Sequence, residues 1–129
     1  MQIHQSAEDY LETILMLNQR MGRVRSIDVV NELGYTKASV SIAMKKLREN
    51  GYIAVDGEGN LTLLEPGREI AERIYSRHRL LTHFFVQLGV DEQTAAEDAC
   101  KAEHILSEQT LEKIRESALR NDATHPQAK

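Results

Sequence analysis

The sequence predicts a mainly α-helical protein with one short β-hairpin near the middle of the chain. Apolar residues recur at helical spacing in six segments of the 129 residues, which is the pattern of amphipathic helices packed on a core. Between the third and fourth segments, "YIAVDGEGNLTLLEPG" holds two short β-prone runs around a glycine-rich loop, as in a hairpin. The predicted order is therefore three helices, a hairpin and three further helices.

Recognisable end signals mark the first three helices. We expect Ser6 to cap a helix over "SAEDYLETILMLNQ", because a serine followed by acidic residues is typical of a helix start. A second helix is expected between Ser26, as its N-cap, and Gly34, as its stop. The third begins at Thr36 and ends at Gly51, so only a short turn separates it from the second.

The later helices are predicted by similar signals. Pro66 suits the first turn of a long helix that continues to Gly89. Asp91 can cap a fifth helix through Leu106, and Ser107 can cap a sixth. The segment 120–129 has no periodicity, and we expect it to be a disordered tail.

Charge is distributed unevenly along the chain. Residues 20–52 carry seven basic and three acidic side chains, although the net charge of the whole is −4. One part of the molecule can therefore face a polyanion while another attracts cations. One cysteine excludes an internal disulfide, and no apolar run approaches the roughly 18 residues of a membrane helix. We expect a cytoplasmic protein with no membrane partner.

A short helix, a tight turn, a basic helix and a hairpin, in that order, predict a winged helix-turn-helix. The second helix of such a pair enters the major groove of double-stranded DNA. Lysines and arginine late in this helix suit phosphates, whereas Ala38 and Ile42 suit thymine methyls. The alternative is an ordinary solvated basic face. The residues expected to contact DNA are Arg25, Thr36, Lys37, Ala38, Ser39, Ser41, Ile42, Lys45, Lys46 and Arg48.

A second set of residues has the chemistry of metal ligands. Cys100, Glu103 and His104 stand at positions i, i+3 and i+4, which share one face of a helix. Borderline divalent metals accept thiolate, imidazole and carboxylate together. The alternatives are a small buried thiol, hydrogen-bonded core histidines and acids that serve a helix dipole. Similar groups lie on other predicted helices, at Asp9, Glu12 and His78.

Three segments carry a resemblance to a known family. The stretches "EDYLETI", "SRHRLL" and "DACKAEHILS", in that order around a winged helix, resemble the diphtheria toxin repressor family of metal-dependent transcriptional repressors. The similarity is greatest to the short manganese transport regulators, which lack the SH3-like domain of many members, and we expect none here. The resemblance implies a DNA-binding domain over residues 1–65, a helical metal-binding and dimerisation domain over 66–119, and a divalent metal as corepressor.

The resemblance also implies a ligand set of mixed character. Five residues match the manganese-type pattern, whereas Cys100 matches the iron-responsive branch. Thr82 and Ala96 stand where that branch has the acid and the histidine of an ancillary site. The choice between Mn(II) and Fe(II), and between one ion and two, therefore stays open. The implied ligands are Asp9, Glu12, His78, Cys100, Glu103 and His104.

The expected function is a homodimeric repressor that binds a palindromic operator and controls metal-homeostasis genes when its corepressor metal is bound. An apolar stripe on the last two helices suits a dimer interface, with an intramolecular bundle as the alternative. Two other functions remain open: a winged-helix regulator whose DNA binding is independent of metal, and a small metalloenzyme or metal buffer. The sequence shows no phosphate loop or paired nucleophile and base, so we expect neither catalysis nor an organic substrate. The stripe residues are Ala95, Ala99, Ala102, Leu106, Leu111 and Ile114.

Overall fold

The computed structural model describes residues 5–124 of the chain. These fall into two compact units, Met1–Arg73 and Ile74–Lys129, each described below by itself. Among the described residues, no helix combines the length and the apolar character that crossing a bilayer requires.

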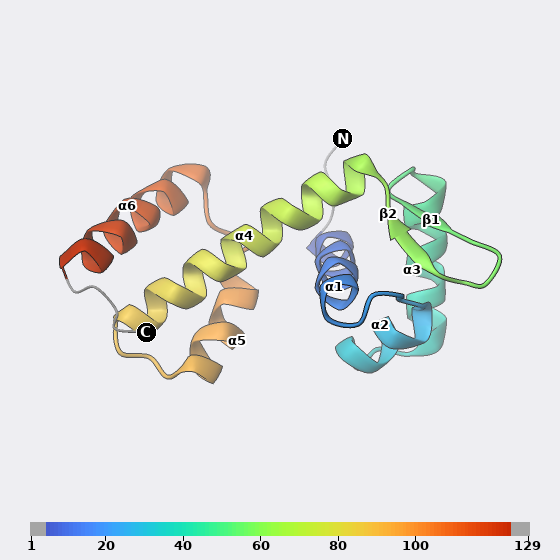
Figure 1. Cartoon of the computed structure of the whole chain (residues 1–129), viewed down its shortest axis with the longest axis horizontal. Coiled ribbons are helices and arrows are strands. Elements are labelled where there is room, and N and C mark those ends of the chain that lie inside the picture. The colour runs from blue at the N-terminus through green and yellow to red at the C-terminus, as the bar shows by residue number, and fades with distance from the viewer. Residues whose placement is uncertain (1–4, 125–129) are drawn as a thin grey trace. The chain divides into compact units, whose positions relative to one another are not determined.

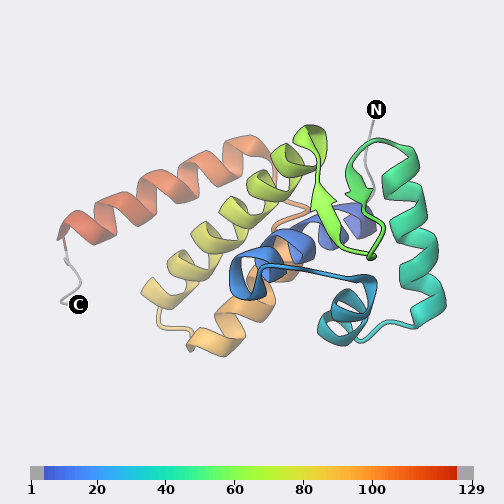
Figure 2. The ribbon, with the colours of Figure 1, turned by 45° about the vertical axis from the view of Figure 1, so that its right-hand side comes forward.

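The first unit contains three helices and a hairpin (Figure 1). Strands β1 and β2 pair antiparallel with Ile53 opposite Leu63, and the hairpin lies beside α3 (Figures 1 and 2). The backbone N–H of Leu61 donates to the carbonyl of Val24 at 2.7 Å, which ties the hairpin to the segment before α2. The elements are α1 (Gln5–Met21), α2 (Ser26–Leu33), α3 (Lys37–Glu49), β1 (Ile53–Val55), β2 (Leu61–Leu63) and the first turns of α4 (Glu65–Gln87). This arrangement confirms the predicted winged helix-turn-helix.

Local side-chain chemistry sets the ends of these short helices. Thr36 caps α3 as predicted, because its hydroxyl oxygen accepts the N–H of Ser39 at 3.1 Å. Gly34 ends α2 in the left-handed conformation, with φ of 72°. The predicted cap of α2 was wrong by one residue: the N-cap is Arg25, whose N–H is accepted by the Asp28 carboxylate at 2.9 Å.

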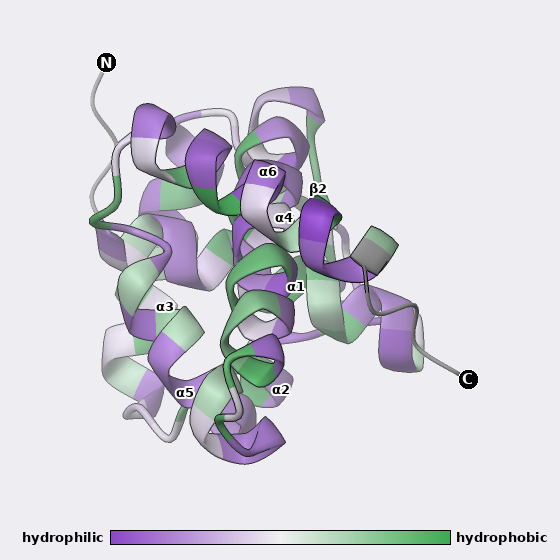
Figure 3. Ribbon diagram, turned by 90° about the vertical axis from the view of Figure 1, so that its left-hand side faces the viewer, coloured by the Kyte–Doolittle hydropathy of each residue, from purple (hydrophilic) through white to green (hydrophobic). Residues whose placement is uncertain are grey.

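The core of the first unit forms around α1. Leu11 and Ile14 of α1, Val29 of α2, Val40 of α3 and Ile53 of β1 are all buried. Figure 3 shows hydrophobic and hydrophilic residues interleaved along the helices, as amphipathic helices require. Because α3 buries one face through Val40, its opposite face is held at the surface.

The second unit consists of the remainder of α4, α5 (Glu92–Ala102) and α6 (Glu108–Thr124). Leu81, Ala99 and Leu111, one residue from each helix, form its buried centre. Asp91 and Ser107 cap α5 and α6 as predicted, accepting the N–H groups of Thr94 and Thr110, each at 3.1 Å. Helix α6 extends to Thr124, so residues 120–124, expected in the tail, are helical. Residues 125–129 lie outside the described part.

Helix α5 is shorter than predicted. It ends at Ala102, and Glu103 is its C-cap, with φ of −60° and ψ of −23°. The N–H groups of Ile105 and Leu106 then both donate to the carbonyl of Ala102, at 3.1 and 3.3 Å, which tightens the chain into a turn. We call residues 103–107 the ligand turn. Glu103 and His104 therefore belong to this turn and not to the body of a helix.

Candidate metal centre and nucleic-acid interface

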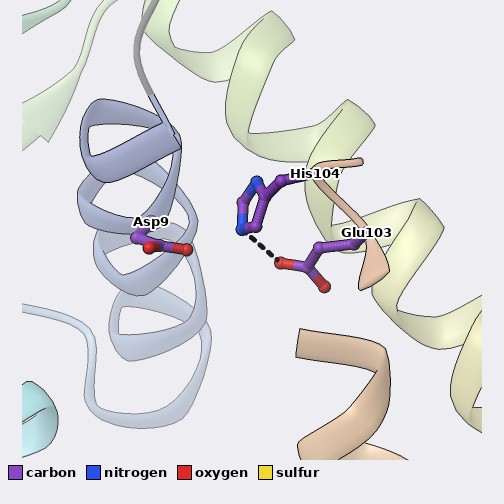
Figure 4. A group of neighbouring side chains, drawn as sticks. All are labelled: Asp9, Glu103 and His104. Carbon is purple, nitrogen blue, oxygen red and sulfur yellow. Dashed lines mark ion pairs between the residues drawn. The ribbon is translucent and has the colours of Figure 1, made fainter. Parts of the chain in front are cut away.

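The second unit brings three of the predicted ligands together. Glu103 has a side chain with 0% exposure, and its two carboxylate oxygens face two different imidazoles. Oε1 lies 3.0 Å from Nδ1 of His78, and Oε2 lies 3.3 Å from Nε2 of His104 (Figure 4 draws the second pair). The result is a buried carboxylate between two histidines, whose side chains are 20% and 2% exposed.

Helix packing positions these three residues. His78 lies on α4, whereas Glu103 and His104 lie on the ligand turn directly after α5. Ala99 packs against Leu81 in the buried centre, and this contact holds the end of α5 close to α4. The hydroxyl of Thr82 donates to the carbonyl of His78 at 2.8 Å, within α4.

The donor chemistry of this cluster fits a divalent transition metal. Two imidazoles and one carboxylate are ligand types that manganese, iron, cobalt and zinc share. A carboxylate removed from water is strongly unfavourable unless positive charge compensates it. A bound divalent cation would supply that charge at Glu103.

The other predicted ligands belong to helices α1 and α5. Asp9 and Glu12 are on α1 in the first unit, three residues apart, and Figure 4 shows Asp9 on that helix. Glu12 is only 5% exposed, which is unusual for a glutamate. Cys100 is on α5 and exposed. The expectation that Cys100, Glu103 and His104 share one helix face assumed a longer α5; the helix ends before Glu103, and Cys100 and Glu103 differ in burial.

Helix α3 presents the predicted nucleic-acid interface. Val40, Met44 and Leu47 of α3 are buried, so the residues between them face outward. Lys45, Lys46 and Arg48 form an exposed basic group toward the end of the helix, and such groups suit phosphates. The ten residues predicted to contact DNA are all exposed: Arg25, Thr36, Lys37, Ala38, Ser39, Ser41, Ile42, Lys45, Lys46 and Arg48.

The tip of the wing carries an acidic group with a structural task. The Asp56 carboxylate accepts the N–H of Asn60 and the N–H of Glu58, each at 2.9 Å, and the Asn60 side-chain amide at 3.0 Å. These hydrogen bonds, led by the backbone N–H of Asn60, hold the pKa of Asp56 below its ordinary value. Asp56 therefore stays charged and orders the loop, which makes the wing tip a poor phosphate ligand.

Two residues beside these sites were not predicted from the sequence. Tyr35 precedes the cap of α3, is 45% exposed, and meets Tyr10 edge to face with ring centroids 5.9 Å apart. Burial is the main cause that raises the pKa of the Tyr10 phenol, and electrostatic interactions with Tyr35 and then Asp9 raise it further. Arg77 precedes His78, and its Nη1 donates to the carbonyl of Glu103 at 3.2 Å. The sequence did contain a signal for each residue. Tyr35 is an aromatic residue in the turn of the helix-turn-helix, and Arg77 is a basic residue next to a candidate ligand.

Comparisons with known proteins agree with a nucleic-acid interface in the first unit and a candidate metal centre in the second. The family model described as "Iron dependent repressor, N-terminal DNA binding domain" matches residues 2–61. A second model, "Iron dependent repressor, metal binding and dimerisation domain", matches residues 64–127. An HTH-type transcriptional regulator of Methanocaldococcus jannaschii is 37% identical over 113 residues, which cover 86% of this chain and 90% of that protein. The HTH-type transcriptional regulator MntR of Bacillus subtilis is 34% identical over 84% of this chain and 77% of its own length.

Solved structures have a similar fold. IdeR of T. acidophilum superposes with a TM-score of 0.79 at 22% identity, over 91% of this chain and 55% of that one, and at this identity only the fold is comparable. A manganese-dependent transcriptional repressor, solved in complex with manganese, gives a TM-score of 0.79 at 28% identity, over 87% of this chain and 52% of that one. The chain thus spans about half the length of these solved proteins.

These matches confirm both the predicted fold class and the predicted family. Together the two family models cover nearly the whole chain, and the first of the curated relatives exceeds 30% identity over most of its own length. Members of the family are DNA-binding regulators and not enzymes. The chain belongs to the iron-dependent repressor family, the diphtheria toxin repressor family of metal-dependent transcriptional regulators.

Proposed function

We propose that the chain is a repressor for which a divalent transition metal, Mn(II) or Fe(II), is the corepressor that controls metal-homeostasis genes. The observation that carries this proposal is the buried carboxylate of Glu103 between His78 and His104. This cluster lies in the segment that matches a metal-binding and dimerisation domain. A regulator without a metal ligand would have no evident use for this arrangement in its core.

The proposed ligand set extends beyond this cluster. Asp9 and Glu12 are included because they match the family pattern and because the Glu12 carboxylate is buried. Cys100 is included as a match to the iron-responsive branch. Since these side chains belong to two domains, metal binding and DNA binding would be thermodynamically linked, and a tenfold change in DNA affinity needs about 1.4 kcal/mol of coupling.

The metal remains a choice between two ions. Asp9, Glu12 and Glu103 supply hard oxygen ligands that suit Mn(II) and Fe(II), whereas a thiolate from Cys100 is softer and favours iron, cobalt or zinc. Relatives named MntR and a structure named as manganese-dependent support manganese. The name of the matching family models supports iron.

On DNA, we propose that a homodimer places two copies of α3 in successive major grooves of a palindromic operator. The exposed face of α3, with Lys45, Lys46 and Arg48, supports this orientation. A symmetric dimer reads two half-sites about one helical turn apart. A target on DNA and a reduced cysteine both suit the cytoplasm.

Metal binding by matched variants tests the centre itself. Glu103→Gln keeps the shape of the side chain but removes its charge, and we expect it to weaken Mn(II) and Fe(II) binding by at least tenfold in competition with a chelating dye. Glu112→Gln is the control, because Glu112 is exposed on α6 and pairs with Arg115. Equal affinities in the two variants would remove Glu103 from the ligand set.

The competing function is a winged-helix regulator whose DNA binding is independent of metal. It predicts equal DNA affinity with and without a chelator, and unchanged affinity in Glu103→Gln. The buried cluster favours the metal-dependent function because a purely structural core seldom retains a carboxylate with no exposure.

A further inference from the structure

Arg77 joins three segments around the candidate metal centre. It precedes His78 on α4, and its side chain is only 13% exposed. Nη1 donates to the backbone carbonyl of Glu103 at 3.2 Å. Nη2 forms an ion pair with the carboxylate of Glu108, in the first turn of α6. One guanidinium therefore connects α4, the ligand turn and the start of α6.

Two backbone N–H groups of the ligand turn, those of Ile105 and Leu106, share one acceptor, the carbonyl of Ala102. Ile105, at its outer edge, is 75% exposed and adds little packing. A planar guanidinium that grips both the first carbonyl of the turn and the helix that follows it is well suited to restrain the segment.

We propose that Arg77 is a positioning residue that holds the ligand turn in the conformation in which Glu103 and His104 can bind metal together with His78. This inference rests on the proposed metal function. Arg77 contacts the backbone of a ligand residue and not the metal. Residues that orient ligands in this way typically change metal affinity by about 10- to 100-fold when they are removed.

The charge of Arg77 makes the proposal separable from a simple electrostatic effect. A guanidinium beside the centre repels a divalent cation, so removal of its charge alone would tighten metal binding. Loss of positioning has the opposite sign, because Glu103 and His104 would then have to be ordered on binding. Weaker metal binding in Arg77→Met, which lacks the charge, can therefore be assigned to lost positioning.

The experiment measures metal affinity and turn order in four variants of the full chain. Mn(II) and Co(II) affinities come from competition with a chelating dye, and hydrogen exchange of residues 103–106 is followed in the metal-free protein. Arg77→Met removes both contacts, Arg77→Lys keeps the charge, and Glu108→Gln weakens only the contact with α6. Arg79→Met is the control, because Arg79 is exposed on the same helix and lies over the Tyr75 ring, 5.9 Å from its centroid.

We expect Arg77→Met to bind metal about 10- to 100-fold more weakly than the wild type, with faster exchange in the ligand turn before metal is added. The metal affinity of Glu108→Gln should lie between those of Arg77→Met and the wild type. Arg77→Lys should bind metal more tightly than Arg77→Met, and Arg79→Met should match the wild type. If Arg77→Met does not fold by circular dichroism, Glu108→Gln decides the question by hydrogen exchange of the ligand turn, because loss of a carboxylate near the centre weakens cation binding by itself. Wild-type affinity or tighter binding in Arg77→Met, or wild-type exchange in Glu108→Gln when that variant decides, overturns the positioning role. Absence of metal binding in the wild type instead overturns the proposed function.

Discussion

At the residue scale, Glu103 and Cys100 show how close positions in a sequence can have opposite environments. Glu103 is fully buried and Cys100 is exposed, although they are only three positions apart in the sequence. The sequence and the family resemblance predicted both as ligands by residue type. They could not predict this difference, because it depends on α5 ending at Ala102 and on the turn that follows.

Cobalt spectroscopy tests whether Cys100 is a ligand. If its thiolate binds the metal, the Co(II) protein has a sulfur-to-metal charge-transfer absorption in the near ultraviolet, and Cys100→Ser removes it. The substitution should also lower the affinity for Co(II) more than the affinity for Mn(II), because manganese prefers oxygen ligands. Identical spectra for the two proteins would assign Cys100 to the surface and leave the other five candidates.

At the scale of the elements, the caps and the glycines were predicted with unequal success. Thr36, Asp91 and Ser107 were correctly predicted as caps, because a hydroxyl or a carboxylate before an apolar-periodic run is a local signal. The need for glycine at position 67 was not predicted. It arises from a close approach of α4 to the backbone of Tyr52, which is distant in sequence.

Gly67→Ala should damage the junction between the wing and α4. A Cβ at Gly67 would lie 2.2 Å from the carbonyl oxygen of Tyr52, and this oxygen accepts the N–H of Leu64 at 2.9 Å. We expect the free energy of unfolding in urea to fall by about 1–3 kcal/mol. Gly57→Ala is the control, since nothing lies within 4 Å of a Cβ there. Equal stability of the two variants would contradict the close approach.

The capping role of Asp91 predicts that the stability of the protein depends on pH. The N–H of Thr94, which Asp91 accepts as the helix cap, lowers the pKa of its carboxyl below the ordinary 3.8. A group with a lowered folded-state pKa stabilises the protein above its unfolded pKa, and this stabilisation is lost as the pH falls through the folded-state value. Urea unfolding should therefore show that the wild type loses more stability than Asp91→Asn on acidification below about pH 4. Parallel losses in the two proteins would contradict this role of the cap.

At the scale of the whole molecule, the sequence correctly predicted the type of protein. The fold class and the family are confirmed by the structure and by the two matching family models. The compact units divide at Arg73 and Ile74, within α4, and the domain boundary expected after residue 65 stays a prediction. The first turns of α4 join the first unit through the buried Ala71 and the ion pair of Arg73 with Glu8, at 3.4 Å. Such tertiary contacts leave no local signal in the sequence.

The central claim is that metal binding and DNA binding are coupled, and DNA affinity measured with and without metal tests it most directly. Fluorescence anisotropy of the reduced, anaerobic protein on duplexes from upstream of its own and neighbouring genes would be titrated with Mn(II) and with Fe(II), and then reversed with a chelator. We predict at least tenfold tighter binding with metal, equivalent to about 1.4 kcal/mol, with reversal by the chelator and no response in Glu103→Gln. The more effective ion at equal free concentration identifies the corepressor. Binding that is tight and unchanged by either ion or by the chelator would contradict the claim and support the metal-independent regulator.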